Sequence, residues 1–80
     1  MNDDFHFEIQ KELGILSKNQ KSNWTKELNI VQWSKGRPKF DVREWSPDKT
    51  KMGKGITLND EEAKILCKLL YAYFSGNAGR

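Results

Sequence analysis

Cationic and aromatic side chains alternate with apolar ones along the stretch RPKFDVREW, residues 37–45. Phe40 and Val42 form one set, and the residues between and beside them form the other: Lys39, Asp41, Arg43 and Trp45. Strict alternation over this length predicts a β-strand with one half-buried face. Cations attract phosphates and aromatic planes stack on unpaired bases, so the second set suits binding chemistry.

Alternation along the preceding strand adds residues to this second face. If Leu28, Ile30, Phe40 and Val42 face the protein interior, Trp33 lies on the opposite face with Arg43. We therefore expect that face to meet a ligand and not a protein core. Trp24 could instead close a strand edge, and Trp45 could cap the core. The predicted nucleic-acid-binding residues are the cations and tryptophans of this region: Lys18, Lys21, Trp24, Lys26, Trp33, Lys35, Arg37, Lys39, Arg43, Trp45, Lys51 and Lys54.

Charge is distributed unevenly along the 80 residues, whose net charge is +3. Residues 18–54 contain ten cationic and four acidic side chains, a net +6, and the remainder is −3. All three tryptophans lie in the basic segment. This asymmetry indicates a polyanionic partner.

Catalytic and metal-binding interpretations find little support in the sequence. Cys67 is the only cysteine, which excludes an internal disulfide, and we interpret it as a buried helix thiol. His6 is the only histidine and lies beside two phenylalanines. Asp41 and Glu44 have opposite strand parity, so they cannot form a carboxylate pair. We expect no enzyme activity, metal, cofactor or small-molecule substrate.

The chain has the length of one small domain, which we place at residues 1–80. No run has the length of a membrane span, and the start MNDDFHF lacks the basic and apolar regions of a signal peptide. We therefore expect a cytoplasmic protein that does not bind membranes.

The elements that position these residues follow from periodicity and turn signals. Phe5, Phe7, Ile9, Lys11, Leu13 and Ile15 form one alternation, and Gly14 marks an expected bend or bulge. Asn59 with Glu62 forms a capping-box pattern that starts a helix. The predicted fold class is α+β, with four antiparallel strands at about 5–17, 24–34, 37–46 and 51–58, a helix at about 60–74 and a frayed tail at 75–80.

The predicted helix is apolar over roughly 220° of its circumference, whereas packing one face on a sheet requires only about 100°. A second copy of the chain is the simplest partner to cover the additional apolar surface of the helix. The alternative is a helix that is buried more deeply in the core of its own chain. The predicted homodimer interface consists of Ile65, Leu66, Leu69, Leu70 and Tyr73.

The run KFDVREWSPDKTKMGKGITLNDEEAKIL, residues 39–66, resembles transcriptional coactivators of the positive-cofactor-four type (PC4/p15-like), especially their small bacterial YdbC-like members. It contains the D-[IV]-R-E-[WY] run at residues 41–45 and the K-G-[IV]-[ST]-L segment at residues 54–58. The resemblance implies a curved four-stranded sheet, a C-terminal helix that dimerises and single-stranded DNA bound across the sheet. By this resemblance, the family's aromatic residue just before the second hairpin corresponds to Trp33, and the cations of that turn to Lys35 and Arg37. The family's strand arginine corresponds to Arg43, and the lysine of its K-G-[IV] segment to Lys54. The chain has a single strand-end aromatic, Trp45, and no serine-rich or acidic arm.

We therefore predict a homodimer that binds single-stranded DNA without sequence preference, in transcription regulation, replication or repair. Stacking uses the π-faces that every base has, so it does not select sequence. Single-stranded RNA remains an alternative ligand. A protein-interaction module that docks an acidic partner on its sheet face is the alternative from another class.

Overall fold

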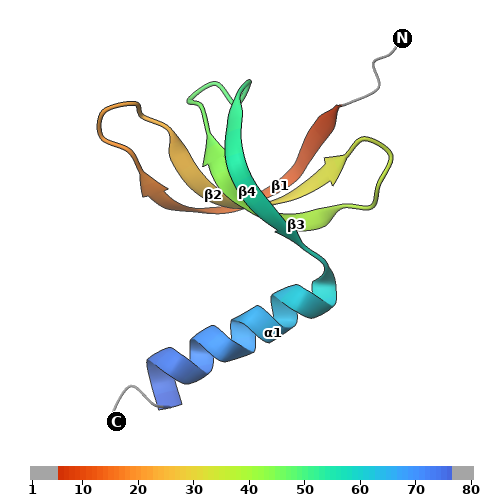
Figure 1. Ribbon diagram of the computed structural model, residues 1–80, viewed down its shortest axis with the longest axis vertical. Helices are drawn as coiled ribbons and strands as arrows, with labels where there is room; N and C mark the ends of the chain where they lie inside the picture. The colour runs from red at the N-terminus through yellow and green to blue at the C-terminus, as the bar shows by residue number, and fades with distance from the viewer. Residues whose placement is uncertain (1–5, 77–80) are drawn as a thin grey trace.

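A computed structural model of the chain describes residues 6–76 (Figure 1). Its elements follow in the order β1 (Phe7–Lys18), β2 (Thr25–Trp33), β3 (Lys39–Trp45), β4 (Met52–Leu58), α1 (Asp60–Tyr71) and a π-helical turn, η1 (Ala72–Gly76). The strands form one antiparallel sheet in the order β1-β2-β3-β4. The predicted α+β class, four antiparallel strands and then one helix, is confirmed. Ser75 and Gly76, predicted to begin a frayed tail at 75–80, lie in η1. The strand position predicted at Phe5 and residues 77–80 of that tail lie outside the described residues.

The sheet curls so strongly that its ends approach each other. Phe7 pairs with Trp33 at one end of β2, and Trp45 pairs with Thr25 at the other end. A flat strand of this length would separate those positions by roughly 26 Å. The Phe7 ring nevertheless lies 5.8 Å from the Trp33 ring and 5.3 Å from the Trp45 ring, centroid to centroid. Figure 1 shows the strands bending away from the helix at both ends, so that the helix lies on the convex side.

Irregular pairing in β1 accompanies this curl. Its register with β2 shifts between Ile9 and Lys11, between Glu12 and Gly14, and between Ile15 and Ser17. The bend predicted at Gly14 is therefore confirmed. The single alternation predicted from Phe5 to Ile15 is wrong, because each bulge inserts an unpaired residue and changes the parity. Lys11 consequently pairs with Ile30 on the convex face and not with the set that contains Phe7.

The buried core lies inside the curl, which corrects the expected assignment of the two faces. Val31 and Trp45 are fully buried, and both belong to the face expected to meet a ligand. The four residues expected to form the core are only half-buried on the convex face: Leu28, Ile30, Phe40 and Val42. Parity correctly separated the two sets, but it carries no information on which way a sheet curls.

The helix begins at the predicted cap. The Asn59 side chain accepts a hydrogen bond from the backbone N–H of Glu62, and the Glu62 carboxylate accepts one from the backbone N–H of Asn59. None of the residues of α1 is buried, and α1 contacts β3 and β4 of the sheet. Cys67, interpreted as a buried thiol, is exposed. The reason is that the helix stands away from the sheet instead of packing closely on it.

An open apolar groove of about 700 Å³ separates α1 from the convex face of the sheet. Sheet residues Leu28, Phe40, Val42 and Leu58 line one wall, and the helix lines the other with residues that include Leu66 and Leu70. Ile65 and Leu69 of the helix do not line this groove, and both are exposed. Large side chains are exposed along the helix, among them Ile65, Leu66, Leu69, Leu70 and Tyr73.

Candidate nucleic-acid interface

Arg43 lies inside the curl and makes contacts with three strands. Its Nε donates to both carboxylate oxygens of Asp41, at 2.8 and 3.0 Å, and its Nη1 donates to the Gly53 carbonyl at 3.2 Å. The guanidinium carbon is 4.7 Å from the centre of the Trp33 ring, a cation–π contact. Only 14% of the Arg43 side chain is exposed. The Asp41 carboxylate therefore balances the charge of Arg43 inside the protein, which argues against the expected contact of Arg43 with a phosphate.

A second buried acid, Glu27, is paired with Lys49 of the β3–β4 turn. Lys49 Nζ lies 3.1 Å from the Glu27 carboxylate and 3.9 Å from that of Glu12 on β1. Asn29 donates to Glu27 at 3.1 Å, and the Thr25 hydroxyl donates to the same carboxylate. Burial raises the pKa of Glu27, but the hydrogen bonds from Thr25, Asn29 and Lys49 outweigh it and hold this pKa below its ordinary value.

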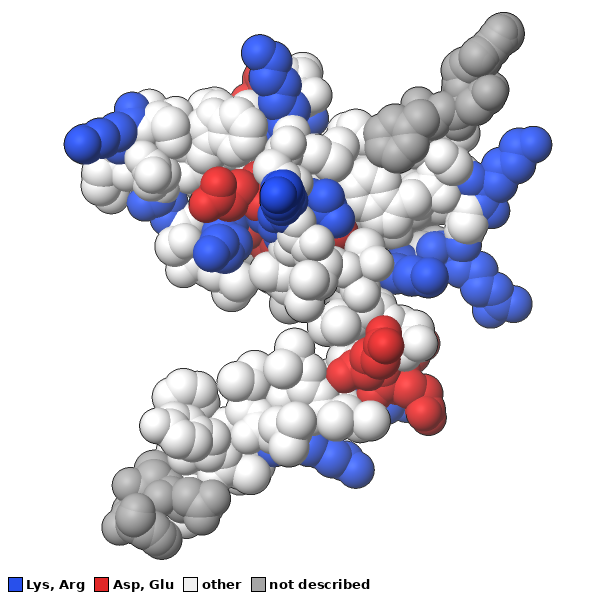
Figure 2. All heavy atoms as spheres, in the orientation of Figure 1, with Lys and Arg blue, Asp and Glu red and all other residues white. Residues whose placement is uncertain are grey.

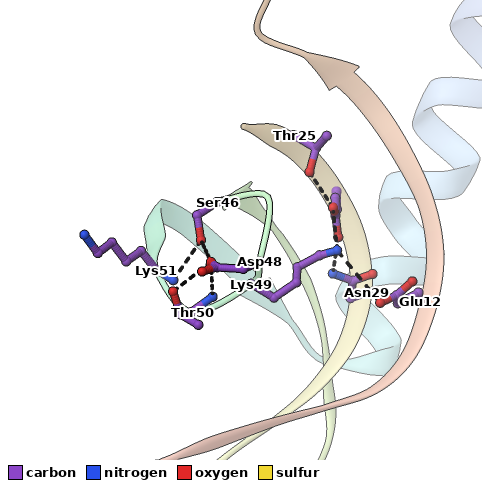
Figure 3. A network of polar contacts seen from close by, with 9 residues as sticks. Glu12, Thr25, Asn29, Ser46, Asp48, Lys49, Thr50 and Lys51 are labelled. Carbon is purple, nitrogen blue, oxygen red and sulfur yellow. Dashed lines mark hydrogen bonds and ion pairs between the residues drawn. The ribbon is translucent and has the colours of Figure 1, made fainter. Parts of the chain in front are cut away.

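Lys49 adopts a left-handed backbone conformation, with φ at 64°, which is uncommon for a residue other than glycine. Figure 3 shows its side chain extending from the turn toward β2 and β1. The ion pair with Glu27 therefore ties the β3–β4 turn to the opposite half of the sheet.

Within the same turn, Asp48 organises the backbone, as aspartate side chains in turns commonly do. Its Oδ1 accepts hydrogen bonds from the Ser46 hydroxyl, the Thr50 hydroxyl and the Thr50 backbone N–H. Ser46 Oγ in turn accepts a hydrogen bond from the Lys51 backbone N–H. The bonds from Thr50, followed by that from Ser46, lower the pKa of Asp48 from 3.8 to about 2.

Most of the predicted cations are exposed. Exposed side chains belong to Lys18, Lys21, Lys26, Lys35, Arg37, Lys39, Lys51 and Lys54. In Figure 2, Lys and Arg side chains project around the sheet half of the molecule, and the largest acidic group lies where the helix begins. That group is Asp60, Glu61 and Glu62. Because Glu27 and Asp41 are buried and paired, the outer surface of the sheet half is predominantly cationic.

The exposed cations form two groups at opposite ends of the sheet. Pairing of Thr25 with Trp45 places the β1–β2 hairpin beside the β3–β4 turn, so Lys18, Lys21, Lys26 and Lys51 belong to one end. Lys35, Arg37 and Lys39 belong to the β2–β3 hairpin at the other end. Lys54 lies on the edge strand β4.

The three tryptophans have different environments. Trp45 has no exposed surface and packs against Phe7, as expected of the alternative in which Trp45 caps the core. Trp33 is half-buried between Phe7 and Arg43. Trp24 is also half-buried, and it lies next to a hollow of about 340 Å³ formed with the β3–β4 turn.

The polar network inside the curl consists of Glu27, Asn29, Asp41 and Lys49 with Arg43, and none of the first four belongs to the predicted nucleic-acid-binding residues. Three of them share the parity of Trp33 and Arg43, and that parity could have revealed them. Lys49 gave no signal of its own, because its role depends on a turn that brings it to a distant strand.

The curled sheet keeps its paired acids inside and its cationic hairpins exposed, a surface whose charge suits an anionic ligand. The family model described as Transcriptional Coactivator p15 (PC4) matches residues 20–69, and the chain belongs to this family. The resemblance seen in the sequence is thereby confirmed. Membership places the chain among nucleic-acid-binding proteins, in a family of DNA-binding coactivators and not of enzymes.

A relative in Treponema pallidum (strain Nichols), an uncharacterised protein, is 49% identical over 71 residues. The similar region covers 88% of this chain and 81% of that protein. Within residues 6–76, no helix is long and apolar enough to cross a membrane.

Proposed function

We propose that this protein binds single-stranded DNA without sequence preference and acts as a homodimer in transcription regulation, replication or repair in the cytoplasm. Membership of the coactivator family supports DNA as the ligand. The sheet supplies cations for phosphates and the half-buried Trp24 and Trp33 for unpaired bases, as single-strand binding requires.

One observation carries the proposal, namely the separation of charge between the inside and the outside of the sheet. Asp41 and Glu27 lie inside with their partners Arg43 and Lys49, and these pairs cancel in charge. Residues 18–54 therefore keep eight exposed cations against two exposed acids, Glu44 and Asp48, so their net +6 lies on the surface of the sheet half. An exposed excess of this size attracts a polyanion and makes binding dependent on salt.

The homodimer is proposed from the apolar helix. The groove beneath it is open, and Ile65 and Leu69 on the helix are 55% and 64% exposed in the single chain. Soluble monomers rarely leave contiguous apolar surface of this kind uncovered. A second copy presents an identical apolar helix, so the two can cover each other around a two-fold axis.

Titration of labelled oligo-dT, the matched single-stranded RNA and the matched duplex at two salt concentrations tests the ligand. We expect tightest binding to the single-stranded DNA, with affinity that falls as salt rises. If the RNA bound as tightly as the DNA or more tightly, single-stranded RNA would replace single-stranded DNA as the proposed ligand. Failure to bind any nucleic acid, together with binding of an acidic peptide, would favour a protein-interaction module.

A further inference from the structure

A slot lies between the β1–β2 hairpin and the β3–β4 turn. It has a volume of about 340 Å³ and is lined by Trp24 on one side and by the turn on the other: Ser46, Pro47, Asp48, Thr50 and Lys51. Trp24 is half-buried, as is Trp33, whereas Trp45 is sealed in the core. An aromatic wall at an open hollow is a potential stacking surface.

Both walls of the slot are held in place by hydrogen bonds. On the hairpin side, Trp24 N–H donates to the Ser22 hydroxyl at 3.2 Å, and Asn19 N–H donates to the Trp24 carbonyl at 2.8 Å. On the turn side, Ser46 N–H donates to the Lys51 carbonyl at 2.9 Å, and Lys51 N–H donates to Ser46 Oγ at 3.0 Å. A slot fixed in this way loses little freedom when a ligand enters, which favours binding.

The charges around the slot indicate the occupant. Lys51 lines it and is exposed, and the exposed Lys18, Lys21 and Lys26 belong to the same end of the sheet. The carboxylate of Asp48 also lines it, but three hydrogen bonds from Ser46 and Thr50 engage its Oδ1 within the turn. A planar aromatic group attached to a phosphate matches this combination of an indole wall and surrounding cations.

We propose that the slot between Trp24 and Pro47 accepts one unpaired base of the bound strand, with the adjoining phosphate at Lys51. The inference rests on the proposed single-strand binding and deepens it, because it extends the path of the strand from the sheet to this hairpin end. Stacking on the indole face accommodates any base, so the slot adds affinity without adding sequence preference.

Fluorescence anisotropy of labelled oligo-dT with Trp24→Leu and Trp24→Phe tests the slot. Loss of one stacking platform should weaken binding by at least about 5-fold in Trp24→Leu. Trp24→Phe keeps an aromatic plane and should retain most of the affinity. Neither variant changes a charge, so the salt dependence should stay that of the unmodified protein, whereas Lys51→Ala should reduce it. Unchanged affinity in Trp24→Leu would overturn the proposal.

A second measurement covers the case in which Trp24→Leu does not fold. In Trp33→Phe protein, the tryptophan emission comes from Trp24 and the buried Trp45. Oligo-dT should quench the emission of Trp24, and bound oligo-dT without quenching would overturn the slot. If the unmodified protein binds no oligo-dT, the proposed function itself fails. If it binds while Trp24→Leu binds equally well, only the slot is wrong.

Discussion

Asp41 and Glu27 are acidic residues inside a protein whose outer surface is cationic. Each has a cationic partner within 3.1 Å, Arg43 for Asp41 and Lys49 for Glu27. Removing one partner of a buried pair leaves an uncompensated charge, which typically costs about 3–5 kcal/mol. At the scale of single residues, these pairs serve to position Trp33 and the β3–β4 turn. Phosphate binding is left to the exposed lysines.

Trp45→Ala should destabilise the protein by about 3–5 kcal/mol, because it removes a fully buried aromatic side chain and leaves a cavity against Phe7. Chemical denaturation followed by circular dichroism measures this loss. Ile56 is 55% exposed, so Ile56→Ala should change the free energy of unfolding by no more than about 0.5 kcal/mol. A small loss for Trp45→Ala would mean that the concave face is open to solvent.

The protein should lose stability on acidification between about pH 4.5 and pH 2. In the folded state, the pKa of Glu27 lies below its ordinary value of 4.5. The pKa of Asp48 is lowered from 3.8 to about 2. As the pH falls, the unfolded chain therefore takes up protons before the folded chain does, and unfolding becomes more favourable. Thermal unfolding at a series of pH values measures the effect.

Asp48→Asn is the matched variant for this pH dependence. It should flatten the part of the curve below about pH 4, where Asp48 would otherwise be protonated in the unfolded chain. A melting temperature that rises on acidification would contradict the assignment of both carboxylates.

At the scale of the elements, residues close together in the chain predicted the helix start and the strands, but the sequence contained no signal for the curl of the sheet. The cap at Asn59, the bend at Gly14 and the four-strand order follow from residues close together in the chain, and all are present. The bulges that follow Ile9 and Ile15 carry no comparable signal, because neither is marked by a glycine. Curling of the sheet depends on those bulges together, so the sequence separated the two faces without showing which one is buried.

The pairing of β3 with β4 depends on Gly55. A Cβ placed there would collide with Arg43 Cβ and the Val42 carbonyl oxygen, and would lie 2.9 Å from Arg43 Cα. Because two of these atoms belong to the backbone, Gly55→Ala should destabilise the sheet by at least about 1–3 kcal/mol. The loss should appear in chemical denaturation as a lower midpoint.

Gly14→Ala is the control for this substitution, since a Cβ at Gly14 meets no atom within 4 Å. Its φ is negative, so alanine fits there and should leave stability unchanged or raise it by up to about 1 kcal/mol. Equal tolerance of alanine at both glycines would show that β4 is not held against β3 as described.

At the scale of the whole molecule, the two halves have different surfaces. The sheet half is surrounded by cations, and the helix half is mainly apolar, with an acidic first turn and two lysines, Lys64 and Lys68. Nucleic acid and a second copy of the chain therefore need not compete for the same surface. A dimer joined through the helices would present two cationic sheets, and an oligonucleotide that reached both would gain avidity.

Leu69→Lys should convert the proposed dimer into a monomer or an insoluble protein. Leu69 is 64% exposed in the single chain, so lysine there would be harmless to a monomer but would bury an unpaired charge in a dimer. Light scattering measures the mass in solution, and Ile65→Lys should behave in the same way. Lys68→Ala, on the same helix, should leave the dimer intact. A stable monomer for the unmodified chain would contradict the dimer.

The affinity for oligo-dT should fall steeply with salt, with a slope of about −0.7 per phosphate contacted when log K is plotted against log salt. Lys54 is exposed on the edge strand of the sheet half, so Lys54→Ala should reduce that slope by less than one unit and leave base preference unchanged. Lys68 has the same charge but lies on the helix, so Lys68→Ala should leave the slope as it is. Titrations of both variants at several salt concentrations measure this difference. Equal slopes for the two variants would show that the strand does not contact Lys54, and affinity independent of salt would exclude binding through the exposed cations.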